Sequence, residues 1–112
     1  MGWEFYALLW LLPLFTVSRT LTGLRAFVEH LGEAEAAREG RHRLASFDSG
    51  PVERFVLGPL FFHYHAEHHL FPRIPSWRLP QAQERIRAHP GYGALVRRHP
   101  SYRAALLDHL AG

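Results

Sequence analysis

The sequence contains neither cysteine nor lysine. The absence of cysteine excludes disulfide frameworks, thiolate zinc sites and cysteine nucleophiles, so any metal site must use histidine, carboxylate or backbone oxygen ligands. All 13 basic residues are arginines, which are scattered from Arg19 to Arg103 without a dense block, and the net charge is only +3. We therefore expect no nucleic-acid partner.

The chain also lacks an uncharged hydrophobic run as long as a complete membrane span. The stretch WEFYALLWLLPLFTVS contains one charge, Glu4, which leaves an uncharged run over residues 5–18, and a spanning helix needs ~20 apolar residues. A signal peptide would begin with positive charge and end in a small-residue cleavage site, and a soluble helix that is apolar on all sides needs a large protein around it. We favour a third interpretation, a membrane helix whose outer end has been cut off or begins near Met1.

Basic residues follow this hydrophobic run and do not precede it. Because Arg19 and Arg25 come after it, the positive-inside rule places its C-terminal end in the cytoplasm. The following stretch TLTGLRAFVEH continues in helical register, with Arg25 and Glu29 spaced to pair across one turn. Residues 3–30 are therefore predicted to form the membrane helix and its extension.

The rest of the chain divides by composition into three segments. Residues 31–50 are charged and rich in alanine and glycine, which predicts a polar loop. Residues 51–72 are apolar but broken by a glycine–proline pair, which predicts an interfacial segment. Residues 73–112 predict a cytoplasmic tail of short helices between prolines, with Ser101 capping the last one. The predicted fold class is all-α, a membrane helical fragment with one apolar transmembrane-type helix followed by interfacial and cytoplasmic helices.

Four of the nine histidines lie within seven residues, in HYHAEHHLFP. His65, His68 and His69 have the spacing H-x-x-H-H, which places them on one helical face with Cβ atoms ~5–6 Å apart. Imidazoles that point one way suit a transition metal that prefers nitrogen ligands, and coordination offsets the cost of burying polar groups. His63 lies off that face in a regular helix and reaches the site only if the helix starts nearby.

A hydrated interfacial patch is the alternative interpretation of these histidines. The zinc signature H-E-x-x-H is absent, because the glutamate of HAEHH stands at another offset, and residue type favours iron over zinc only slightly. Glu67 projects elsewhere on the helix. We expect it to be solvated or paired with an arginine such as Arg73, and not to be a ligand.

The string HYHAEHHLFPRIPSWRLP resembles the last histidine box of the membrane fatty acid desaturases and related hydroxylases, in which H-x-x-H-H is followed by L-F-P, then by I-P or V-P and a leucine–proline. RAFVEH resembles the arginine-x-x-x-glutamate-histidine element near the cytoplasmic end of the last membrane helix of that family. ERFVLGPLFFHYH and the tail LVRRHPSYRAALLDHL also fit, so the resemblance covers nearly the whole chain.

The resemblance implies an integral membrane protein of helices with its histidine box on the cytoplasmic side. Carried over by position, His65, His68 and His69 are expected to be iron ligands of the third box, and His30 the additional ligand before it. His63 stands where many members have asparagine, which leaves its role open between a ligand, a water-mediated contact and no contact.

The family uses two irons to activate dioxygen and abstract hydrogen from an unactivated C–H bond, usually on an acyl chain. Such a step is too hard for side-chain acid–base chemistry, so a redox metal must carry it. The resemblance therefore implies iron as the cofactor, a lipid or acyl substrate, the membrane as the environment, and a ferredoxin or small haem cytochrome as the electron donor.

The two earlier histidine boxes of the family have no separate counterpart in this sequence. Four or five imidazoles cannot complete two iron sites, so we expect the chain to be the C-terminal part of a desaturase-like oxidoreductase that is inactive alone. Whether the chain is itself an enzyme stays open. One alternative is a non-enzymatic histidine-rich metal-binding membrane peptide, and another is an interfacial scaffold in which the histidines are incidental.

Overall fold

The structure is a computed structural model that describes residues 2–38 and 44–112. Its helices are α1 (Trp3–Tyr6), α2 (Arg19–Glu29), α3 (Glu33–Arg38), α4 (Pro51–Val56), α5 (His65–Leu70), α6 (Leu79–Ala88), α7 (Pro90–Gly93) and α8 (Tyr102–Ala111). Two π-helical turns, η1 (Ala7–Leu11) and η2 (Leu14–Ser18), two 3-10 turns, η3 (Pro59–Phe61) and η4 (Ser76–Arg78), and two strands, β1 (Leu44–Phe47) and β2 (Val96–His99), complete the described elements. The chain is mostly helical with one small sheet, which confirms the predicted fold class.

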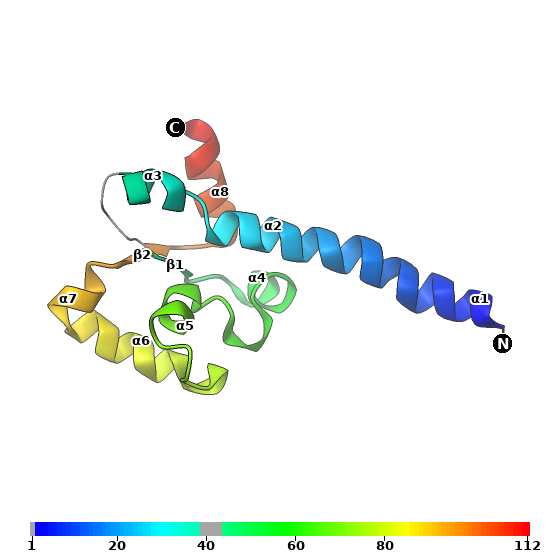
Figure 1. Cartoon of the computed structure of the whole chain (residues 1–112), viewed down its shortest axis with the longest axis horizontal. Helices are drawn as coiled ribbons and strands as arrows, with labels where there is room; N and C mark the ends of the chain where they lie inside the picture. The colour runs from blue at the N-terminus through cyan, green and yellow to red at the C-terminus, as the bar shows by residue number, and fades with distance from the viewer. Residues whose placement is uncertain (1, 39–43) are drawn as a thin grey trace.

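The elements from α1 to α2 join into one helix of 27 residues, Trp3–Glu29, which is long and apolar enough to cross a membrane. At 1.5 Å per residue this helix is about 40 Å long, more than the ~30 Å hydrocarbon core of a bilayer. Figure 1 shows it extending away from the rest of the chain, which we call the body, and its most apolar stretch is not buried against the body. The helix thus continues well past the uncharged run that ends at Ser18.

Pro13 lies inside this helix, between η1 and η2. Proline lacks an N–H group and its ring crowds the preceding turn. Wider π-helical turns on both sides relieve that crowding, and the Thr16 hydroxyl donates a hydrogen bond to the Leu12 carbonyl at 2.6 Å. The helix therefore continues through the proline.

Strands β1 and β2 form a parallel two-stranded sheet in which Leu44 pairs with Val96 and Phe47 with His99. Three residues of β1, Ala45, Ser46 and Phe47, are buried. The segment predicted as a polar loop therefore contains a buried strand. The four-residue sequence LASF is too short to show the alternating pattern that identifies a strand.

The core of the body lies where α2, β1 and α8 meet. It contains Val28, Ala45, Phe47, Tyr102 and Ala105, and the Tyr102 ring stacks on Phe47 with centroids 4.0 Å apart. Aromatic stacking of this kind adds to the free energy gained by burial. The core therefore attaches the body to the C-terminal end of the long helix.

The first turn of α8 is capped by two side chains. The Ser101 hydroxyl accepts a hydrogen bond from the Ala104 N–H at 2.9 Å, which confirms the predicted cap. The Glu53 carboxylate of α4 accepts hydrogen bonds from the N–H groups of Tyr102 at 3.1 Å and Arg103 at 3.4 Å. This carboxylate fixes α4 against α8.

Helix α5, which carries the histidine box, packs on both strands and on α6. In Figure 1 it lies in the middle of the body, below the point where α2 ends. The sheet and α6 therefore hold the histidine box close to the end of the long helix.

Candidate metal centre

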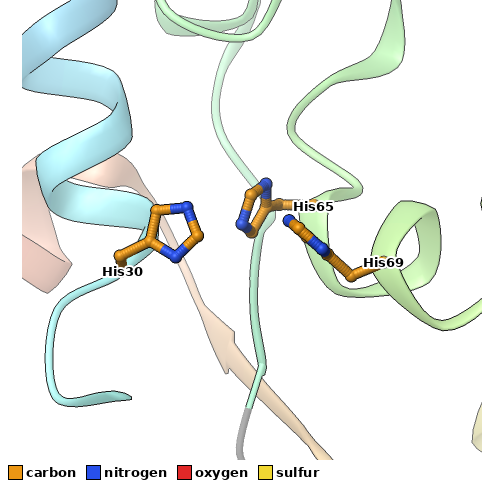
Figure 2. A group of neighbouring side chains, drawn as sticks. All are labelled: His30, His65 and His69. Carbon is orange, nitrogen blue, oxygen red and sulfur yellow. The ribbon is translucent and has the colours of Figure 1, made fainter. Parts of the chain in front are cut away.

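Three of the predicted ligands come together between α2 and α5. His30 follows the last residue of α2, while His65 and His69 are the first and fifth residues of α5. Their ligand nitrogens all lie within 4.8 Å of one another, and Figure 2 shows the three rings gathered between the two elements. The ring centroids are 5.0 Å apart for His30 and His65, 4.4 Å for His65 and His69, and 5.9 Å for His30 and His69.

Local backbone geometry produces this grouping. His65 and His69 are four residues apart, so α5 stacks them on one face. The backbone of His30 is no longer helical, with φ −102° and ψ 10°, and the chain turns away from α2 at this residue. The end of the long helix thus supplies the third imidazole to a pair arranged by α5.

A buried carboxylate contacts the central histidine of this group. The Nδ1 atom of His65 lies 3.4 Å from Oε2 of Glu29, and the Nε2 atom of His65 is buried without a hydrogen-bond partner among the described residues. A carboxylate at one ring nitrogen orients the imidazole and leaves the other nitrogen for a metal. Glu29 is therefore placed to position His65.

Glu29 is itself held from two sides. The Tyr102 hydroxyl donates a hydrogen bond to its Oε1 at 2.9 Å, and the Nε atom of Arg25 lies 3.4 Å from its Oε2. The second contact confirms the pair predicted from the spacing of Arg25 and Glu29. These contacts reach the centre from α8 and from the preceding turn of α2.

Burial keeps the central imidazole neutral. Loss of solvent lowers the pKa of His65 to about 3, and the neighbouring His69 and His30 add to that effect. Burial first, and then His30 and His68, also lower the pKa of His69. A neutral imidazole is the form that binds a metal, so both rings are in the ligating form at neutral pH.

His30 is more exposed than His65 and has its own acidic neighbour. Its Nδ1 atom lies 2.8 Å from Oε2 of Glu33, and about half of its side chain is open to solvent. This contact also orients a ring by a carboxylate at Nδ1, but in a more solvated setting than the contact of Glu29 with His65. We expect it to matter less, because solvent screens it.

The other two candidate ligands lie outside this group. The His68 ring lies edge-on to Phe62 at 6.1 Å and to His69 at 5.8 Å between centroids, but its nitrogens are not among those grouped within 4.8 Å of one another. His63 is buried, with Nδ1 3.4 Å from the Gly58 carbonyl oxygen, and burial lowers its pKa. Its Nε2 atom has no hydrogen-bond partner among the described residues. A metal role for either histidine stays a prediction.

Glu67 differs from its expected exposure, because its side chain is completely buried. It accepts hydrogen bonds from the Ser46 hydroxyl and from Nε2 of Gln83, the latter at 3.2 Å. The arginine near it is Arg98, at 3.7 Å, and not Arg73 as predicted. A buried acid must find partners, and these come from β1, α6 and β2, which the local sequence around Glu67 does not reveal.

The residues that sequence reasoning missed surround the ligands. Glu29 was identified as a partner of Arg25 and as part of the R-x-x-x-E-H element but not as a contact of His65, and Tyr102 was not identified as a partner of Glu29. The spacing R-x-x-x-E-H was the one available signal, because it places a carboxylate directly before a candidate ligand.

The group fits a transition-metal ion by its chemistry. Three imidazoles, one with a buried unpartnered nitrogen oriented by a carboxylate, suit iron or zinc better than a hard cation such as magnesium or calcium. Three donors hold one ion and leave coordination positions open. The described residues therefore supply part of a centre and not a complete pair of sites.

Comparisons with known proteins identify the family of the chain. The profile of the fatty acid desaturase family matches residues 1–101 of the chain. The dihydrorhizobitoxine desaturase of Bradyrhizobium elkanii is 33% identical over 89 residues, which are 80% of this chain and 25% of that relative. No solved structure matches the chain. The chain thus spans about a quarter of the length of this curated relative, and it belongs to the fatty acid desaturase family, as the histidine motif predicted.

Proposed function

We propose that this member of the fatty acid desaturase family forms the C-terminal part of a membrane-bound di-iron oxidoreductase that acts on lipid acyl chains with dioxygen. The observation that carries the proposal is the grouping of His30, His65 and His69 at the end of a helix long enough to span a bilayer. When bound, iron supplies the redox chemistry that an unactivated C–H bond requires.

In this proposal the residues of the chain hold the metal and orient its ligands. His65 and His69 offer neutral nitrogens from α5, His30 closes the group from α2, and Glu29 orients His65. His68 and His63 are proposed to join the centre, with the missing donors, when the rest of the enzyme is present. The incomplete donor set is the reason to expect no activity from the chain alone.

The proposed orientation places this centre on the cytoplasmic side of the membrane. Arg19 and Arg25 lie in the half of the helix that is nearer the histidines, and basic residues favour the cytoplasmic side. A ferredoxin or small haem cytochrome in the cytoplasm would then deliver the electrons. The substrate would enter from the bilayer along the apolar face of the helix.

A second substrate class follows from the printed name of the relative, a dihydrorhizobitoxine desaturase. An assay with each compound distinguishes the two substrate hypotheses. Acyl lipids and dihydrorhizobitoxine are supplied in turn to membranes that contain the chain together with the missing histidine boxes. Oxygen-dependent formation of a double bond in dihydrorhizobitoxine, and in none of the acyl lipids supplied, would contradict the acyl proposal.

Metal loading tests the centre itself. The chain, reconstituted in lipid nanodiscs, is loaded with Fe²⁺ without oxygen, and bound iron is measured by metal analysis. We expect iron to bind and the double variant His65→Ala, His69→Ala to lose it, while the exposed His89→Ala variant keeps it. Retention of iron by the double variant would contradict the proposal.

Activity separates the two metal-binding hypotheses. We expect the iron-loaded chain to show no oxygen-dependent desaturation by itself and to gain it when the missing histidine boxes are supplied. If those boxes restore nothing while iron still binds, the alternative of a non-enzymatic metal-binding membrane peptide is favoured.

A further inference from the structure

A set of large apolar side chains is exposed on the body. They come from three elements, α4 and η3, which precede α5 along the chain, and η4, which follows it. The exposed residues are Val52, Phe55, Val56, Leu60, Phe61 and Trp77, which we call the apolar patch. Exposed apolar patches of this kind mark contact surfaces for membranes or other proteins.

The elements that carry the patch lie side by side. Helix α4 contacts η3, and η3 contacts η4 although they are separated along the chain. Glu53 caps α8, while Val52 and Phe55 of the same helix are 75% and 83% exposed. In Figure 1, α4 lies on the side of the body from which the long helix extends.

The backbone of η3 is strained in a way that maintains this exposure. Leu60 has φ 53° and Phe61 has φ 69°, although bulky side chains rarely adopt left-handed geometry. Leu60 is nevertheless 74% exposed, so burial in the body does not compensate for the strain. Strained backbone at an exposed apolar site indicates a contact that the body itself does not provide.

The chemistry around the patch favours a lipid surface over a protein partner. Arg54, Arg73 and Arg78 are exposed on or next to the same elements, and Trp77 is the kind of side chain that concentrates at membrane interfaces. Arginines beside an apolar face suit the boundary between anionic headgroups and acyl chains. The long helix crosses such a boundary where it meets the body.

We propose that α4, η3 and η4 form an interfacial anchor, which inserts the apolar patch at the cytoplasmic surface of the bilayer and places the three arginines on anionic lipid headgroups. The proposal rests on the membrane insertion in the proposed function. The anchor fixes α5 at a set depth, because α5 follows η3 directly along the chain.

Tryptophan fluorescence tests the anchor with the full chain in vesicles. A variant with Trp77 as its single tryptophan carries Trp3→Phe and Trp10→Phe, and a reference with Trp10 alone carries Trp3→Phe and Trp77→Phe. A matched control replaces all three by phenylalanine and adds Tyr92→Trp, on α7. The vesicles contain phosphatidylcholine with or without phosphatidylglycerol, and the quenchers are lipids brominated near the headgroup or iodide in the water.

We expect brominated lipids to quench Trp77 several-fold more than the control tryptophan at position 92, and iodide to do the opposite. Quenching of Trp77 by iodide would overturn the anchor, and so would shielding of Trp77 from both quenchers, which would mean that protein covers the patch. If Trp10 is not quenched by brominated lipid, membrane insertion itself fails. If Trp10 is quenched and Trp77 is not, only the anchor fails.

Vesicles with and without anionic lipid test whether the three arginines contact lipid headgroups. We expect phosphatidylglycerol to increase the lipid quenching of Trp77, and the triple change Arg54→Gln, Arg73→Gln and Arg78→Gln to remove that increase. A matched triple change to glutamine at other exposed arginines should keep it; these are Arg85, Arg87 and Arg103. Persistence of the increase in the first variant would overturn the headgroup contact.

Discussion

Two buried glutamates, Glu29 and Glu67, lie close to the histidine box and have different neighbours. Glu29 is 3% exposed and contacts Arg25, Tyr102 and His65. Glu67 is fully buried, with Ser46, Gln83 and Arg98 as its partners. Only Glu29 contacts a member of the three-histidine group. The comparison shows that burial of an acid is not by itself a sign of a metal site, because its partners decide its role.

The two acids act on different sides of α5: Glu67 belongs to this helix, whereas Glu29 contacts it from α2. His65 and His69 share one face of α5, whereas Glu67, two residues after His65, projects at about 200° from it in a regular helix. The Ser46 hydroxyl also accepts a hydrogen bond from the Ala66 N–H at 3.1 Å. Glu67 therefore joins α5 to the sheet from behind, while Glu29 orients the ring in front.

The largest effect is expected from Glu67→Ala. The change leaves the Ser46 hydroxyl and the Gln83 amide without their buried acceptor and removes the carboxylate near Arg98, which keeps its hydrogen bonds to Asp48. Breaking one side of such a network costs about 3–5 kcal/mol. We expect the body to unfold at much lower denaturant concentration, as measured by circular dichroism in nanodiscs. Iron binding should fall with the fraction of folded chain.

The matched change Glu67→Gln keeps the shape and one acceptor oxygen. It should lower stability less than alanine does and should leave the metal affinity of the folded chain unchanged. A loss of affinity in a folded Glu67→Gln chain would break the comparison, because it would give Glu67 a direct part in the centre.

The sequence predicted the parts of this arrangement that are local. The spacing of His65 and His69, the Arg25–Glu29 pair and the Ser101 cap follow from helical geometry within one or two turns. The hydrophobic run predicted a helix of membrane-spanning type, although the helix is longer than the run.

The contacts between residues far apart in the chain could not be predicted from the sequence. The burial of Glu67 depends on Ser46, which lies in a strand too short to recognise, and on Arg98, which lies in the strand paired with it. The expected exposure of Glu67 to solvent was wrong for this reason, and the alternative of pairing with an arginine holds for Arg98 and not for Arg73. The exclusion of His68 from the three-histidine group depends on where His30 falls, which the spacing of α5 does not contain.

The second-largest effect is expected from Glu29→Gln. The amide keeps the size of the side chain and can still accept from Tyr102, but it removes the charged partner of His65 Nδ1. Losing such a partner typically lowers metal affinity by about 10- to 100-fold. Titration with Co²⁺, followed by visible absorption, measures this loss.

Stability should change less in Glu29→Gln than in Glu67→Ala. The matched control is Glu33→Gln at the more exposed partner of His30, for which we expect a smaller loss of affinity. Equal losses in the two variants would show that burial of the Glu29 contact has no special importance.

A smaller effect is expected from Tyr102→Phe. The change keeps the stack on Phe47 but removes the hydroxyl that donates to Glu29, which leaves one oxygen of a buried carboxylate without this donor. A lost hydrogen bond of this kind costs about 1 kcal/mol. Metal affinity should fall by less than in Glu29→Gln, and the same Co²⁺ titration measures it.

If Tyr102→Phe binds metal as well as the unchanged chain while it unfolds more easily, Tyr102 supports the core alone. The double variant with Glu29→Gln distinguishes these roles. Losses of affinity that do not add would show that Tyr102 acts through Glu29.

The smallest effect is expected from Ser101→Ala, which separates stability from metal binding. The change removes the hydroxyl that accepts from Ala104 N–H, and loss of a helix cap costs about 0.5–2 kcal/mol. Glu53 still accepts from Tyr102 and Arg103, so the loss should lie at the lower end of that range. Because Ser101 contacts none of the three histidines, the affinity for Co²⁺ should not change, and Ser101→Asp should restore stability. A fall in affinity from this change would mean that any loosening of α8 reaches the centre through Tyr102. The effect of Glu29→Gln could then no longer be assigned to its contact with His65.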